Sequence, residues 1–230
     1  MHSAPDMRIP PDLTPIKPPW IFPNKASTAA SAQAASEAIC AVYDNCLRYV
    51  GAVALHEFCR NNIAAVTAYA RHSIENGIEY DSRTGTDIFP IWEQSARRLA
   101  ALAAHDFGEA FRIAQAKLLS DPVLTVLIDK GAFKPIGKKL RALFPASVAA
   151  RNAAAHPEAF LQRDHGLREG HEVEGVRVPP TTTIQDGYIE GFYTTSFNGV
   201  AVTCPISPNA AIELTGITND FVRVLAPLAE

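Results

Sequence analysis

Apolar side chains recur three and four residues apart over three long stretches of the chain, which is the spacing of one face of an α-helix. The first stretch predicts a helix near residues 28–50, the second a helix that continues from it to Gly77, and the third a helix from about 89 to 119. Gly77 suits the position after a last helical turn, and we expect a bend between the first two helices around Gly51. The third stripe comprises Ile91, Trp92, Ala96, Leu99, Ala103, Phe107, Ala110, Phe111 and Ala114.

Shorter elements are predicted after residue 119. Asp121-Pro122 marks a boundary, and a short helix is expected at 122–130. A basic helical stretch then runs from about Ile136 to His156, with Pro145 as an interruption or a restart.

The C-terminal part of the chain differs in kind. The run GYIEGFYTTSF, the pair Asn198-Gly199 and the run VAVTCPIS predict two strands, at about 188–206, joined by a tight turn. Ser207 and Pro208 provide a cap and a first-turn proline for a final helix at about 208–226. The predicted fold is mainly α, a helical bundle with a C-terminal β-hairpin appended before the last helix.

Proline separates an N-terminal arm from this bundle. Seven of the 17 prolines lie in the first 23 residues, where they prevent a helix. We therefore expect a proline-rich arm over residues 1–26 and one helical domain over 27–230. The sequence leaves three hypotheses open for this arm. It wraps the bundle through Trp20 and Phe22, it binds a partner in an extended form, or it is disordered.

Composition and cysteine spacing narrow the class of protein. With 47% hydrophobic and 20% charged residues among 230, the chain is typical of a globular protein. No apolar stretch approaches the roughly 18–20 residues of a membrane-spanning helix, so we expect a cytoplasmic protein with no membrane partner. The cysteines show neither CxxC spacing nor the density of a disulfide scaffold, and should pack as small hydrophobes. They are Cys40, Cys46, Cys59 and Cys204.

Charge is distributed unevenly along the chain. Residues 130–157 carry six basic residues and no acidic one, whereas residues 1–129 carry a net charge of −3 and residues 158–230 a net charge of −6. A local basic window is suited to contact a polyanion, and a solvated helix face is the alternative. The candidate RNA-binding residues in this window are Lys134, Lys138, Lys139 and Arg141.

One group of residues in the sequence is suited to catalysis. The sequence ARNAAAHPEAF places Arg151 and His156 five positions apart, with Asn152 directly after the arginine. This RNxxxH pattern lies late in a helical domain and precedes a polar loop, a hairpin and a helix opened by Ser-Pro. In both motif and order of parts, the chain from about 27 to 226 resembles the HEPN family (higher eukaryotes and prokaryotes nucleotide-binding domains). The resemblance implies a nuclease that pairs two copies of the motif across a two-fold dimer cleft.

The motif residues suit metal-independent cleavage of RNA. His156 can take a proton from a ribose 2′-hydroxyl or give one to the departing 5′ oxygen. Arg151 stays charged and can stabilise the charge on the transition state, while Asn152 can orient either group or the phosphate. Because the RNA supplies its own nucleophile, no metal or other cofactor is expected, and the product would be a 2′,3′-cyclic phosphate.

Geometry sets a condition on this hypothesis. On an uninterrupted helix, Arg151 and His156 would point about 140° apart. His156 precedes Pro157 and is therefore biased out of the helical conformation, which could return its ring towards the arginine. Alternatively, two subunits of a dimer share the site, and this would also join two basic windows for RNA.

Other candidate sites have less support. His56 with the nearby cysteines matches no common zinc module, and HEFCR lacks the second histidine of HExxH. We expect His165 and His171 in the polar loop to be solvated and not to bind a metal. We expect Arg97 and Arg98 on a solvated helix face and Trp92 in the core. Three acidic residues on the earlier helices could support the RNxxxH motif, and the sequence selects none of them: Glu57, Glu93 and Asp106.

The sequence therefore predicts a HEPN-like endoribonuclease acting on RNA as a homodimer, with Arg151, His156 and Asn152 at the site of cleavage. A free-standing nuclease needs restraint, so the resemblance suggests a toxin or anti-phage defence effector held inactive by an antitoxin or regulatory protein. The alternative is a non-catalytic helical module that binds a partner protein, RNA or a nucleotide through the same cleft.

Overall fold

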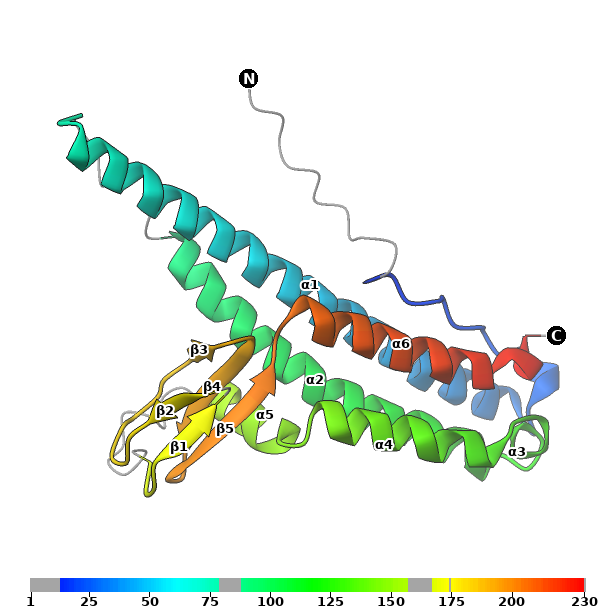
Figure 1. Cartoon of the computed structure of the whole chain (residues 1–230). Coiled ribbons are helices and arrows are strands. Elements are labelled where there is room, and N and C mark those ends of the chain that lie inside the picture. Colours follow the sequence, from blue (N-terminus) through cyan, green and yellow to red (C-terminus); the bar gives the residue numbers. More distant parts are fainter. Residues whose placement is uncertain (1–12, 79–87, 157–166, 174, 230) are drawn as a thin grey trace. The chain divides into compact units, whose positions relative to one another are not determined.

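The structure, a computed structural model, describes residues 13–78, 88–156, 167–173 and 175–229. Its helices (Figure 1) are α1 Ala29–Glu75, α2 Ile88–Ser120, α3 Leu124–Leu127, α4 Phe133–Leu143, α5 Ser147–Ala155 and α6 Pro208–Val224. Its strands are β1 His171–Val173, β2 Val176–Val178, β3 Gly187–Ile189, β4 Phe192–Phe197 and β5 Val200–Pro205. The predicted fold class is confirmed, because the described chain is mainly helical and its small antiparallel sheets precede the last helix.

The first two predicted helices are one continuous helix. α1 continues through Gly51 and ends at Glu75, so the two helices predicted from the sequence are a single element. The strong helix formers on both sides of this single glycine outweigh its cost of about 1 kcal/mol. Gly77, with φ +66°, has the left-handed conformation expected of a residue that follows a helix.

α2 confirms the third predicted helix but not its whole apolar stripe. The C-terminal part of the stripe is buried, with Ala96, Phe107 and Ala114 fully covered. Near the start of the helix, Trp92 is 43% exposed, so the core position predicted for it was wrong. Trp92 makes an edge-to-face contact with Phe89, which is also on α2.

The predicted stretch from 136 to 156 is divided at Pro145 into α4 and α5. Pro145 cannot donate a helical hydrogen bond, which explains the division. The short helix expected at 122–130 is limited to α3 and is followed by a 3₁₀ turn at Lys130–Ala132. The predicted final helix is confirmed as α6.

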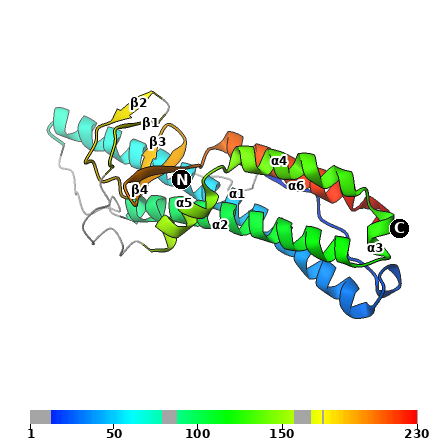
Figure 2. The same cartoon turned by 90° about the horizontal axis from the view of Figure 1, so that it is seen from below.

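The hairpin predicted at Asn198-Gly199 is also confirmed. Its strands β4 and β5 pair in register from Phe192↔Pro205 to Phe197↔Val200, and both turn residues have positive φ, as a type I′ turn requires. The single strand predicted before this turn is instead divided at Glu190-Gly191, where a second such turn joins β3 to β4. A further hairpin, β1–β2, lies in the segment predicted to be a polar loop; both sheets can be followed in Figure 2.

The contacts divide the chain into two compact units. Unit 1 comprises Met1–Gly51, Asp106–Pro145 and Asn209–Glu230, and unit 2 comprises Ala52–His105 and Ala146–Pro208. In unit 1, the rings of Phe111, Phe133 and Phe221 lie within 5.5–6.4 Å of one another, centroid to centroid. The single domain predicted over 27–230 stays a prediction.

Residues 13–26 of the predicted arm lie on unit 1. Ile21 is 1% exposed, and its backbone N–H donates to Ser36 Oγ at 2.9 Å. Trp20 and Phe22 are both more than half exposed, so this part of the arm is held by other contacts, among them Ile21 and the hydrogen bond from Ile16 N–H to Asn219 Oδ1, and not by the two aromatic residues that the sequence suggested. Residues 1–12 lie outside the described residues.

Asp121 secures the start of α1 and the start of α3 together in unit 1. Its buried carboxylate accepts hydrogen bonds from the backbone and hydroxyl of Ser27 and from the backbone N–H groups of Val123 and Leu124. Burial raises the pKa of Asp121, but these hydrogen bonds outweigh it and hold the pKa at about 2. The sequence identified Asp121 only as a helix boundary.

Contrary to the expectation from the sequence, α1 is long and apolar enough to cross a membrane, judged by length and composition alone. Half of its most apolar 18-residue window is buried in the structure. The core helix of a soluble protein passes the same test, so the cytoplasmic location stays a prediction.

Candidate functional site

The RNxxxH motif lies on α5, in unit 2. α5 packs on β4 and β5 (Figures 1 and 2), and it buries Ala150, Ala153 and Ala154. Small alanines on the inner face let this short helix lie close to the sheet. The helix ends at Ala155, one residue before His156.

The end of α5 frees His156 from helical geometry. His156 has φ −125° and ψ 60°, outside the α region, as expected for a residue that precedes a proline. Its backbone N–H still donates to Asn152 O at 3.2 Å, and its side chain is exposed. The backbone angles of His156 thus leave the helical values from which the divergence of about 140° was calculated.

Arg151 and Asn152 form a pair. Arg151 Nη1 donates to Asn152 Oδ1 at 3.1 Å, and both side chains are half-buried. A hydrogen bond to a guanidinium restricts the rotamers of a long side chain, so that less freedom is lost when it binds a ligand. The structure thus brings together Arg151 and Asn152, with His156 one turn further along the chain.

The four predicted RNA-binding residues lie on α4, in unit 1. Lys134, Lys138 and Arg141 are exposed, and their spacing of four and three residues places them on one helix face. Lys139 lies on a different face, and its Nζ forms an ion pair with Asp220 Oδ2 at 2.7 Å. We name Lys134, Lys138 and Arg141 the α4 basic stripe.

Sequence reasoning did not identify a second polar cluster in unit 2. We name it the Tyr188 cluster; it consists of His56, Glu57 and Arg60 on α1, Glu93 and Arg97 on α2, and Tyr188 on β3. The His56 ring lies 4.6 Å from the Tyr188 ring, centroid to centroid. The Arg60 guanidinium lies 4.5 Å from the same ring, and its Nη1 donates to Tyr188 Oη at 2.9 Å.

His56 is buried and neutral. It is fully covered, and burial together with the charges of Arg97 and Arg60 lowers its pKa to about 4. Its Nδ1 lies 3.7 Å from Glu93 Oε1, which is too far for a hydrogen bond. Four buried atoms of the Tyr188 cluster have no hydrogen-bond partner within the described residues: His56 Nδ1 and Nε2, Glu57 Oε1 and Arg97 Nε. Buried polar groups without partners are uncommon, and a functional role is one explanation for them.

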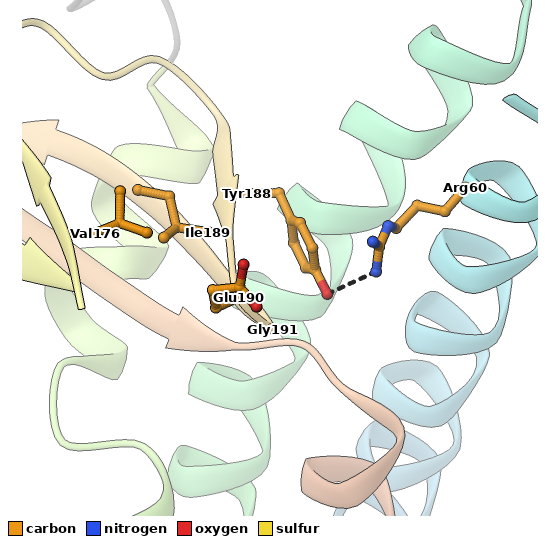
Figure 3. A pocket seen from close by; sticks show the side chains of 6 residues that line it. All are labelled: Arg60, Val176, Tyr188, Ile189, Glu190 and Gly191. Carbon is orange, nitrogen blue, oxygen red and sulfur yellow. Dashed lines mark hydrogen bonds between the residues drawn. The ribbon is translucent and has the colours of Figure 1, made fainter. Parts of the chain in front are cut away.

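A cavity of about 400 Å³ opens beside the Tyr188 cluster. Figure 3 shows Tyr188 pointing towards Arg60, with Glu190 and Gly191 at the adjoining turn. The cavity is lined by Arg60, Val176, Tyr188, Ile189, Glu190 and Gly191, all of unit 2. Its lining combines one cationic, one anionic, one phenolic and two aliphatic side chains, so it can offer a small ligand both hydrogen bonds and apolar contact.

A neighbouring network of hydrogen bonds includes Arg98, so the prediction that Arg98 lies on a solvated helix face was wrong. Arg98 forms an ion pair with Asp186, whose carboxylate also accepts from Gln94 Nε2 at 2.9 Å and from Tyr193 Oη at 3.0 Å. Arg97 is also mostly covered, and its Nη1 lies 3.8 Å from Glu93 Oε1. Both arginines thus form ion pairs within unit 2 and do not lie on a solvated helix face.

The sequence contained only a weak indication of the Tyr188 cluster. His56 and Arg60, like Glu93 and Arg97, lie four residues apart on alanine-rich helices, so each pair shares a helix face. The contribution of Tyr188 depends on the division of one predicted strand into β3 and β4, which the sequence did not predict. Asp106 belongs to unit 1, so of the three acidic candidates only Glu57 and Glu93 lie in the same unit as the motif.

No group of three or more His, Cys, Asp or Glu side chains within the described ranges is arranged to hold a metal ion. The cysteines of the discarded zinc reading are all free thiols. His165 lies outside the described residues. Comparison of the chain with protein-family models, with curated proteins and with solved structures found no match.

Proposed function

We propose that the chain is a metal-independent endoribonuclease of the HEPN type, with Arg151, Asn152 and His156 at the site of cleavage. The observation that carries the proposal is the end of α5 at Ala155, one residue before His156. This end leaves an exposed imidazole five residues after a guanidinium that a hydrogen bond to Asn152 restricts. A general acid or base and a fixed cation at one phosphate are what this reaction needs.

The proposed reaction needs only the RNA and these side chains. The ribose 2′-oxygen attacks the adjacent phosphorus, the bond from phosphorus to the 5′ oxygen breaks, and a 2′,3′-cyclic phosphate and a 5′-hydroxyl form. His156 removes the 2′-hydroxyl proton or protonates the departing 5′ oxygen. Arg151 stabilises the charge that develops on the phosphate oxygens.

A homodimer completes the proposal. Two copies of the motif that face each other across a two-fold axis provide two imidazoles, one for each proton transfer. The α4 basic stripe of each copy supplies phosphate contacts for a single-stranded RNA. In the cytoplasm such an enzyme acts as a toxin or an anti-phage defence effector, and an antitoxin or regulatory protein restrains it.

The test is incubation of the purified protein with labelled total RNA in EDTA, beside Arg151→Ala and His156→Ala. Lys117→Ala, on the exposed part of α2, is the matched control for loss of a charge. We expect cleavage with 2′,3′-cyclic phosphate ends, lost in both motif variants and kept in the control. Circular dichroism and sedimentation check that fold and dimer persist. No cleavage of this RNA or of RNA from phage-infected cells would overturn the proposal.

A non-catalytic binding module is the second candidate function. Exposed apolar side chains favour it, among them Tyr69 and Ile74 of α1 and Ile91 and Trp92 of α2. Such residues mark a binding surface for another protein where they form one contiguous patch. RNA or nucleotide binding without cleavage, in a dimer with an intact motif, would favour this candidate.

A further inference from the structure

The cavity beside Tyr188 has hydrogen-bonding groups of both kinds. Arg60 provides guanidinium donors, only one of which is used by Tyr188 Oη. Glu190 provides carboxylate acceptors, and it is exposed at the turn between β3 and β4. Val176 and Ile189 add apolar contact surface. A ligand that matches this lining is small, partly apolar, and has an acceptor edge next to a donor edge.

The donor side of the cavity is already ordered. Arg60 lies over the Tyr188 ring and donates to its hydroxyl, so two contacts hold the guanidinium in place. The buried His56 ring packs against the same tyrosine. Such prior ordering reduces the entropy that is lost when a ligand binds.

The acceptor side is positioned by the backbone. Glu190 has φ 42° and Gly191 has φ 93°, the two successive positive values of a type I′ turn. A residue other than Gly, Asn or Asp at this position costs about 1–3 kcal/mol in strain. The two-residue turn between paired strands therefore fixes the backbone position from which the Glu190 side chain extends.

Among the RNA bases, guanine alone has this arrangement of groups. Its N1–H and N2–H₂ are adjacent donors for one carboxylate, while its O6 and N7 are adjacent acceptors for one guanidinium. Adenine would place an acceptor, N1, against the carboxylate. Pyrimidines lack the N7 acceptor.

We propose that this cavity binds a guanine base, with Arg60 donating to O6 and N7 and Glu190 accepting from N1 and N2. This proposal rests on the proposed function, because it names the base of the RNA substrate that the protein recognises. A free guanine nucleotide offers the same chemistry and is the other source of the base.

The test measures binding separately from cleavage. Calorimetric titration of the full chain with GMP and with AMP is followed by titration with RNA hexamers that contain one guanine or none, in the His156→Ala background. We expect GMP to bind at least about tenfold more tightly than AMP, since each correct paired contact discriminates by roughly this factor or more. Glu190→Gln should abolish the preference, and Arg60→Ala should weaken GMP binding about tenfold or more. Equal affinity for GMP and AMP would overturn the proposal.

Matched substitutions guard against a general effect of charge or folding. Glu172→Gln, exposed on β1, and Arg71→Ala, exposed on α1, should leave the preference for GMP unchanged. If Glu190→Gln keeps the preference, the proposed acceptor is wrong. If the protein binds GMP but not the guanine-containing hexamer, the ligand of the pocket is the free nucleotide and not RNA.

The two proposals fail in different ways. Cleavage of RNA with no preference for guanine, together with equal affinity for GMP and AMP, overturns the pocket and leaves the nuclease. Selective GMP binding that depends on Glu190, with no cleavage of any RNA, supports the pocket and overturns the nuclease.

Discussion

Arg98 of α2 holds the buried carboxylate of Asp186, which lies just before β3. Asp186 is 3% exposed and also accepts from Gln94 and Tyr193, so three side chains, two from α2 and one from β4, meet at one carboxylate. Burial and the neighbouring Asp186 raise the pKa of the Tyr193 hydroxyl, which keeps it a donor at neutral pH. This network fixes the sheet to α2 within unit 2.

Removal of Arg98 should therefore destabilise the protein strongly. Arg98→Ala leaves the carboxylate buried without its cation, which typically costs about 3 kcal/mol or more. Urea unfolding followed by circular dichroism measures the change in the free energy of unfolding. Arg112→Ala breaks the solvent-exposed pair with Glu109 and should change stability little. Similar effects of the two substitutions would contradict a structural role for Arg98.

A second prediction concerns the turn between β4 and β5. Gly199 has φ +82°, and a Cβ added there would lie 2.7 Å from the side chain of Arg168. Gly199→Ala should reduce the free energy of unfolding by about 1–3 kcal/mol, because the left-handed conformation is strained for alanine. Gly216→Ala, in the middle of α6 with open space around it, should be neutral or stabilising by up to about 1 kcal/mol. The prediction fails if both substitutions act in the same direction.

Local signals in the sequence were sufficient for most helices and for one hairpin. The spacing of apolar residues located α2 and α6, Asn198-Gly199 located a turn, and Pro145 marked the division between α4 and α5. Each of these depends on the residues of one short segment, for which backbone preference and periodicity are good guides.

Contacts between distant segments were not predictable in this way. Glu190-Gly191 lacks the usual Asn-Gly or Asp-Gly signal, so β3 and β4 were read as one strand. The pairing of Arg98 with Asp186 joins residues 88 positions apart, and that of Ser27 with Asp121 joins residues 94 apart. A charged residue on an amphipathic helix looks solvated until its partner is known. The Tyr188 cluster was missed for this reason, whereas the three motif residues were close in sequence.

The buried His56 predicts an acid-sensitive fold. Its pKa is about 4 in the folded protein against 6.5 in the unfolded chain, so between these values the unfolded chain binds more protons. Stability from this group is complete above pH 6.5 and is lost as the pH falls towards 4, by about 3 kcal/mol. The charged and titratable groups near the ring are Arg60, Glu93, Arg97 and Tyr188.

His56→Phe removes the titrating group and the two ring nitrogens that lack partners. Urea unfolding at pH 7, 5.5 and 4 should show a smaller loss of stability on acidification in the variant than in the wild type. Parallel curves for the two proteins over this range would show that His56 does not control the acid sensitivity.

The α4 basic stripe gives a prediction about RNA affinity that adjacent lysines can test. Lys138 is exposed on the stripe, whereas Lys139, the next residue, is tied to Asp220. For single-stranded nucleic acid, each phosphate contact adds about 0.7 to the slope of log affinity against log salt concentration. In the His156→Ala background, Lys138→Gln should weaken binding of labelled RNA and reduce this slope by about 0.7. Lys139→Gln should do less, because Asp220 already neutralises that charge. Equal effects would show that position on the stripe is irrelevant and that only net charge determines the affinity.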